Sequence, residues 1–137
     1  AIEQQSVQLD LEPLKDAIQS YREAAASLQL HCFKKEEDQD ESGLDGGLTI
    51  HDVGDVVASC NEKLGLTERH FLDTNGLPGR PWFRHVLQAP GMDLGYAAEA
   101  FPGIQQAIDD GNWTLAQEQV TVASERVKSA AGHLKPQ

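Results

Sequence analysis

The sequence predicts an all-α fold: an antiparallel helical bundle of three long helices and one short helix, with a long irregular loop before the short helix. Three segments carry apolar residues at alternating steps of three and four, which is the spacing that places side chains on one face of a helix. The segments between them are rich in glycine, proline and acidic residues. The length suits one core, so we expect residues 1–137 to form a single domain.

The first helix is predicted over residues 8 to 32. Pro13 falls in its first turn, where a missing N–H does no harm. The charged segment that follows has too little apolar surface to fold on its own, and we expect an acidic solvated loop over residues 33–47. The apolar positions of the helix are Leu11, Leu14, Ile18, Tyr21, Ala25 and Leu28.

The second helix is predicted to follow Thr49, a suitable N-cap residue. Gly65 is the expected C-terminal cap, although the apolar pattern resumes briefly as far as Phe71. The apolar positions of this helix are Ile50, Val53, Val57, Cys60 and Leu64.

The last helix is predicted to start after Asn112-Trp113-Thr114, and a short helix over residues 102 to 110 should begin at Pro102. The remaining irregular loop, residues 72–101, is far longer than the connections usual in compact bundles. We therefore expect contacts to hold this loop, some of them from outside the chain. The apolar positions of the last helix are Ala116, Val120, Ala123, Val127, Ala130 and Leu134.

Charge and motif content exclude several functions. A net charge of −11 disfavours binding to nucleic acid or anionic lipid, and no apolar run reaches the roughly 20 residues of a membrane span. The sequence has no catalytic motif, and no two of its five histidines have the spacing of a metal-binding pair on a helix. We expect no catalytic residues, metal or cofactor in this chain. Because the sequence does not begin with Met, we expect it to be part of a longer protein.

Cys32 and Cys60 each fall on or beside an apolar helix face. The favoured interpretation is a small core residue in each case, and a single bridge between adjacent helices is the alternative. Asn112 opens a glycosylation sequon, which favours a secreted or lumenal glycoprotein.

Polar groups in the aromatic loop have two interpretations each. His85 is either an imidazole bonded to loop carbonyls or a residue near a ligand, and Tyr96 is either a core aromatic or a hydroxyl facing a polar ligand. Arg80 and Arg84 have the forked donors that bind a carboxylate, either of a ligand or of an Asp or Glu in this acidic domain.

The run GLPGRPWFRHVLQAP, followed by GYAAEAFPGI, resembles the C-terminal helical domain of the transferrin receptor and glutamate carboxypeptidase II family. Its matching elements are Gly76-Leu77-Pro78, Arg80-Pro81, Arg84-His85-Val86, Ala89-Pro90, Tyr96, Glu99 and Phe101-Pro102-Gly103. The resemblance implies a transferrin receptor-like dimerisation domain, which packs against its counterpart in a homodimer. It also implies a membrane-anchored parent with a protease-like domain and an apical domain. In the peptidases the zinc ions and all their ligands lie in the protease-like domain, so zinc is expected only there.

The family also implies a role for the loop, which in the peptidases reaches the active site. There a Lys-Tyr pair holds the carboxylate of a C-terminal glutamate. Tyr96 occupies the tyrosine position, whereas Gly95 stands at the lysine position. The loss of the ammonium charge weakens carboxylate binding, since charge-assisted hydrogen bonds are about twice as strong as neutral ones. A strict preference of the parent for C-terminal glutamate is therefore not implied.

The leading hypothesis is a non-catalytic domain that mediates homodimerisation of a glutamate carboxypeptidase-like (zinc peptidase-like) parent protein. The domain would lie on the extracellular or lumenal/vacuolar side of a membrane in the secretory pathway. The loop would contribute Tyr96, Gly95 and His85 to the edge of the parent's substrate pocket. The partners are then a second copy and the parent's protease-like and apical domains. The alternative is a stand-alone helical-bundle binding module with a ligand groove under the aromatic loop. Apolar loop residues expected to be uncovered in this chain are Trp82, Leu87, Leu94 and Tyr96.

Overall fold

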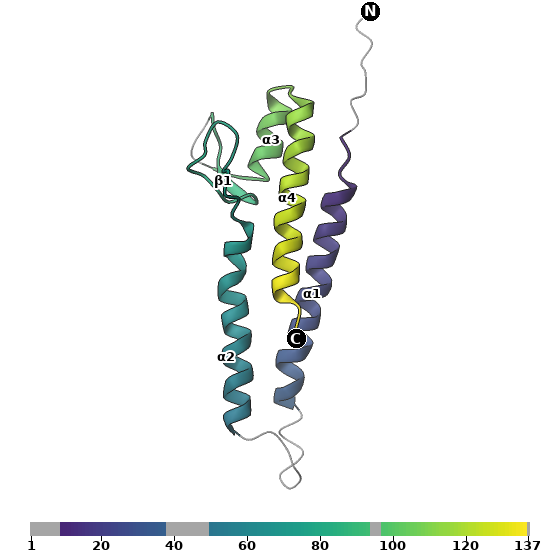
Figure 1. Cartoon of the computed structure of the whole chain (residues 1–137), viewed down its shortest axis with the longest axis vertical. Helices are drawn as coiled ribbons and strands as arrows, with labels where there is room; N and C mark the ends of the chain where they lie inside the picture. The colour runs from purple at the N-terminus through teal and green to yellow at the C-terminus, as the bar shows by residue number, and fades with distance from the viewer. Residues whose placement is uncertain (1–8, 38–49, 94–96, 137) are drawn as a thin grey trace, which may run out of the picture.

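The computed structural model describes residues 9–37, 50–93 and 97–136, and this part of the chain is mostly helical, as predicted. Helix α1 spans Glu12–Glu37, α2 spans Ile50–Leu66, α3 spans Pro102–Asp109 and α4 spans Trp113–Leu134. A 3-10 helix, η1, covers Thr67–Phe71, and two short strands, β1 at Gln88–Pro90 and β2 at Ala98–Ala100, pair within the loop. Figure 1 shows that α2 runs opposite to α1 and α4.

Helix α1 ends later than the sequence suggested. It continues to Glu37, because the lysines and glutamates after Phe33 are good helix formers. The first five residues of the predicted loop 33–47 are therefore helical. The rest of that loop, and the predicted N-cap Thr49, lie outside the described residues.

The predicted cap at Gly65 was wrong. Helix α2 includes Gly65, ends at Leu66 and passes directly into η1, where the resumed apolar pattern buries Phe71. Among the described glycines, positive φ angles occur at Gly76, Gly79 and Gly111 instead. A glycine in a helix interior does not end the helix when the residues beyond it pack against the core.

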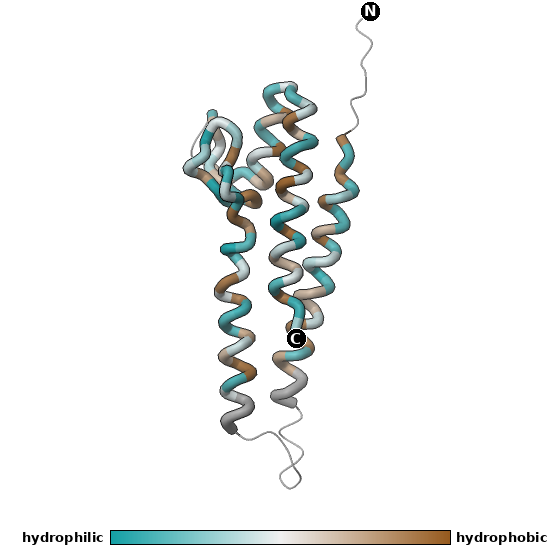
Figure 2. Tube along the Cα trace, in the orientation of Figure 1, coloured by the Kyte–Doolittle hydropathy of each residue, from teal (hydrophilic) through white to brown (hydrophobic). Residues whose placement is uncertain are grey.

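The core lies between α1 and α4, which run parallel and side by side (Figure 1). Leu14 of α1 clusters with Val120 of α4, and Leu28 clusters with Leu134. The partners' numbers rise together along the two helices, which is the mark of a parallel pair. Figure 2 shows hydrophobic positions recurring along both helices among hydrophilic ones.

Small side chains at the contact let helices α1 and α4 lie close together. Alanine supplies a large share of the fully buried positions, and an alanine face lets two helix backbones approach closely while leaving little void. Larger side chains at such positions would overpack the contact, typically at about 1–3 kcal/mol each. The buried alanines of the two helices are Ala17, Ala24, Ala116, Ala123, Ala130 and Ala131.

Helices α3 and α4 form a tight antiparallel hairpin. Gly111 takes a positive φ of 70° in the turn, and the Asn112 side chain then accepts a 3.1 Å hydrogen bond from the Leu115 N–H as the N-cap of α4. Pro102 begins α3, as predicted, and Ile104 is buried against the α1–α4 pair. The hairpin places the end of the aromatic loop beside the core.

Helix α2 joins the core at a few points. A disulfide joins Cys32 of α1 to Cys60 of α2, with the Cα atoms 6.4 Å apart. Near the end of α2, the Lys63 ammonium donates to the carbonyls of His133 and Lys135, 3.2 and 2.7 Å away, at the C-terminus of α4. The bridge interpretation of the cysteines is therefore confirmed, while the close-packed bundle of three long helices stays a prediction.

Removing the disulfide should destabilise the chain. The bridge spans 28 residues of sequence, for which loop-closure entropy corresponds to roughly 3–4 kcal/mol. The variant Cys32→Ser with Cys60→Ser should therefore unfold at a clearly lower urea concentration than the oxidised wild type. Reduced wild type serves as the control and should match the variant. Equal midpoints for oxidised wild type and variant would contradict the prediction.

Candidate functional site

The aromatic loop is an ordered structure built on a small antiparallel sheet. Ala89 of β1 pairs with Glu99 of β2, and the Gly91 N–H donates to the Ala97 carbonyl at 3.1 Å. The loop is tied to the hairpin by the Phe101 N–H, which donates to the Leu87 carbonyl at 2.9 Å. Tyr96 and Gly95, the predicted substrate contacts, lie outside the described residues.

The first half of the loop is a compact turn that depends on glycine. The Leu77 N–H donates to the Phe83 carbonyl at 2.8 Å, and the Arg80 N–H donates to the Leu77 carbonyl at 2.9 Å. Gly76 has a φ of 71°, and a Cβ placed there would collide with the Pro81 backbone. Glycine at residue 76 is therefore required both by backbone conformation and by space.

Arg80 links the two halves of the loop. It is only 6% exposed, its guanidinium donates to the Pro90 carbonyl of β1, and it lies over the Phe83 ring at 5.4 Å from the centroid. Within the described residues its Nε has no hydrogen-bond partner. In that part of the chain Arg80 contacts a backbone carbonyl and an aromatic face and forms no ion pair with Asp or Glu, and binding of a ligand carboxylate stays a prediction.

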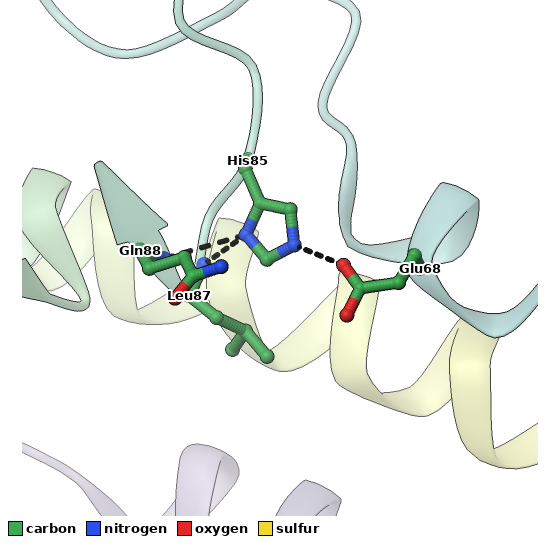
Figure 3. A network of polar contacts seen from close by, with 4 residues as sticks. All are labelled: Glu68, His85, Leu87 and Gln88. Carbon is green, nitrogen blue, oxygen red and sulfur yellow. Dashed lines mark hydrogen bonds and ion pairs between the residues drawn. The ribbon is translucent and has the colours of Figure 1, made fainter. Parts of the chain in front are cut away.

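His85 ties the loop to η1 (Figure 3). Its Nδ1 accepts from the N–H groups of Leu87 and Gln88, at 3.2 and 3.3 Å. The proton of the neutral ring is therefore on Nε2, which donates to Glu68 at 2.8 Å. Among the described residues, the ring bonds to backbone N–H groups and a carboxylate, and the bonds to loop carbonyls that the first interpretation expected are not found there. Its role toward a substrate stays a prediction.

An apolar groove of about 350 Å³ lies between α1 and α2. Phe33 and Leu64 on its walls remain 58% and 59% exposed, and Val57 is 37% exposed. Val57 and Leu64 belong to the predicted apolar face of the second helix, and the spacing that predicts this face does not show that it stays exposed. Its lining is Tyr21, Ala25, Leu28, Gln29, Cys32, Phe33, Val57, Cys60, Asn61, Leu64 and Leu134.

A second cavity, of about 240 Å³, lies between the first turn of the loop and α3. Arg80, Met92 and Gly103 are among its lining residues, whereas Trp82 and Phe83 are not. Trp82 is 69% exposed, as expected for an uncovered loop. Leu87 instead packs partly against the core cluster around Phe71, and the expectation for it was wrong.

The described residues contain no group of three or more metal-ligating side chains. Within that same part of the chain, no helix is long and apolar enough to cross a membrane. Asn112, the predicted glycosylation site, is exposed and uses its side-chain oxygen as the α4 cap.

These features describe a helical interaction domain, with an apolar groove and a braced aromatic loop on its surface. A profile of the transferrin receptor-like dimerisation domain matches residues 9–135. The chain therefore belongs to the transferrin receptor-like dimerisation domain family, as the sequence motif indicated.

Curated relatives carry this domain within much longer proteins. A probable glutamate carboxypeptidase of Arthroderma benhamiae is 47% identical over 66 residues, which are 48% of this chain and 9% of that protein. An inactive zinc metalloprotease of Schizosaccharomyces pombe is 38% identical over 60 residues, which are 44% of this chain and 7% of that protein. The aminopeptidase NAALADL1 of Rattus norvegicus is 27% identical over 140 residues, and the match covers 96% of this chain and 17% of that protein. The chain thus spans less than a fifth of each of these relatives.

Replacing His85 should loosen the loop. His85→Ala leaves the Leu87 and Gln88 N–H groups without their acceptor, which should cost about 1–3 kcal/mol of unfolding free energy. Glu68→Gln keeps an acceptor for Nε2 and, at a carboxylate that is 72% exposed, should change stability little. Urea unfolding of both variants provides the measurement. A loss as large for Glu68→Gln as for His85→Ala would contradict this assignment of roles.

Proposed function

We propose that this chain mediates homodimerisation of a glutamate carboxypeptidase-like parent, and that the groove between α1 and α2 forms part of the contact between the two copies. The family match supports self-association. We choose this surface because the groove is apolar and three of its lining residues, Phe33, Val57 and Leu64, remain exposed.

The groove has the composition expected of a contact surface. Large apolar side chains that stay exposed in a monomer mark interaction sites, especially when they gather in one concave region. Here they come from two helices fixed to each other by the disulfide, so the walls are preorganised. A rigid surface loses less conformational entropy on association.

Charge opposes this association over longer range. Two copies with a net charge of −11 each repel one another, and salt screens that repulsion. An apolar contact between acidic domains should therefore strengthen as ionic strength rises. A contact built on ion pairs would weaken under the same change.

Substitution at Leu64 tests the surface. Leu64→Asp places a charge in the groove wall and should weaken dimerisation by tenfold or more, since burying an unpaired carboxylate costs several kcal/mol. Leu30→Asp is the matched control, because Leu30 is 68% exposed on α1 and is not part of the groove lining. Sedimentation equilibrium across micromolar concentrations measures both. Equal dissociation constants for Leu64→Asp and wild type would exclude this surface.

The second part of the proposal concerns the aromatic loop, which would form the edge of the parent's substrate pocket through Tyr96, Gly95 and His85. The support is the ordered frame that flanks residues 94–96: the β1–β2 pair, the Arg80 contact to Pro90, and the His85–Glu68 hydrogen bond. Such a frame fixes the position from which a short segment reaches a neighbouring domain. The exposed Trp82 supplies an apolar contact for that domain.

Replacing Tyr96 in the full-length parent tests the pocket role. Tyr96→Phe should lower kcat/KM for peptide cleavage about tenfold or more, as expected for a lost hydrogen bond to a charged carboxylate. Gly95→Lys should raise the preference for a C-terminal glutamate. Thr121→Val removes an exposed hydroxyl on α4, outside both the groove and the loop, and is the control that should leave cleavage unchanged. Unaltered kinetic constants in Tyr96→Phe would argue against the role of its hydroxyl.

We further propose a zinc-dependent carboxypeptidase activity for the parent, with zinc held by its protease-like domain, and a location on the lumenal or extracellular side of the secretory pathway. The relatives' names support a peptidase-type parent, although one of them is an inactive metalloprotease. The disulfide supports the location, because such bridges persist mainly in oxidising compartments.

A further inference from the structure

Two histidines stack where η1 meets the last turns of α4. The ring centroids of His70 and His133 lie 4.4 Å apart, and the ring planes differ by 28°. Both residues are half-buried. Neither lines the groove or belongs to the aromatic loop, so the proposed function does not use them.

Hydrogen bonds place this pair at the junction of three elements. His70 Nδ1 lies 2.9 Å from the Ser129 hydroxyl of α4. His133 Nε2 donates to the Lys63 carbonyl of α2 at 2.9 Å, and the Lys63 ammonium returns a bond to the His133 carbonyl at 3.2 Å. The same Lys63 carbonyl accepts from the Thr67 hydroxyl at 2.7 Å. The ends of α2 and η1 are thereby fastened to the end of α4.

The charged groups around His70 are mostly cationic. On α4 they are His133 and Arg126, and on α2 the Lys63 ammonium contacts the same joint. On η1 itself, Arg69 adds a positive charge, while the Glu68 carboxylate is engaged by His85. Burial lowers the pKa of His70 below its ordinary 6.5, and the charges of His133 and Arg126 lower it further.

We propose that the stacked His70–His133 pair is a proton-sensitive joint, which holds α2 and η1 against α4 while the rings are neutral and loosens when His70 gains a proton. Protonation would place a cation against a second imidazole, beside Arg126, in a site that water only partly reaches. The joint lies next to two groove residues, since Lys63 precedes Leu64 and His133 precedes Leu134. Loosening the joint would therefore change the position of α2, which carries the groove residue Leu64.

The direction of the pH effect follows from the lowered pKa. The unfolded chain binds a proton at His70 more readily than the folded chain does. Above about pH 6.5, the pKa in the unfolded chain, His70 makes its full contribution to the free energy of unfolding. That contribution is lost as the pH falls from there toward the lower pKa of the folded chain. A difference of one unit between the two pKa values changes the ratio of folded to unfolded chain about tenfold.

Urea unfolding of the 137-residue chain at about pH 7.5 and about pH 5, the range in which histidine titrates, tests the joint. On acidification the ratio of folded to unfolded chain should fall several-fold further for wild type than for His70→Gln, whose side chain has no group that titrates between these pH values. His31→Gln, on α1, removes a histidine outside the joint and should keep the wild-type profile. Identical pH profiles for wild type and His70→Gln would overturn the proposal.

A measurement on wild type alone guards against a variant that fails to fold. The NMR titration midpoint of the His70 ring should lie below the ordinary histidine pKa of 6.5. Amides of residues 63–71 should also exchange faster with solvent in acid than at neutral pH, after correction for intrinsic rates. A His70 midpoint at or above 6.5, with no change in exchange, would overturn the joint as a pH-sensitive element.

Discussion

The alanine-lined contact between α1 and α4 is the constraint on which the rest of the structure depends. Ala17, Ala116 and Ala130 are completely buried, so the two parallel helices lie close together and leave no room for a third helix between them along most of their length. The α3–α4 hairpin packs on one end of this pair through Ile104. Phe71 and Val86 pack near its middle and bring η1 and the aromatic loop with them.

The same contact determines what α2 can do. Because α4 already covers the buried face of α1, α2 reaches the core through the Cys32–Cys60 bridge and through Lys63. The side chains of Val57 and Leu64, which would be buried in a closed bundle, line a groove instead. Lys63 and the histidine pair fasten the C-terminal end of α2, so the wall of the groove that α2 forms depends on a joint in which burial disfavours protonation of His70.

Local signals in the sequence predicted the helices well. Pro102 identified the start of α3, and the steps of three and four identified the buried face of α4, although α4 begins at Trp113, inside the triplet after which it was predicted to start. Tertiary contacts decided the rest. Gly65 stays helical because η1 follows it and buries Phe71. Val57 shows the limit of periodicity, which assigns a residue to a helix face but does not say whether another element covers that face. Arg80 and His85 each bond to backbone groups that the folded loop brings to them, and no spacing in the sequence reveals these partners.

The central claim is that the groove between α1 and α2 is where two copies meet. Methyl NMR of the leucines in a dilution series tests it most directly, because every leucine reports separately and no substitution is needed. If the two copies meet at the groove, the methyl signals of the groove leucines Leu28, Leu64 and Leu134 should shift with protein concentration. The methyl signals of Leu77, in the loop, should not shift. Shifts confined to Leu77 and Leu115, beside the loop cavity, would contradict it.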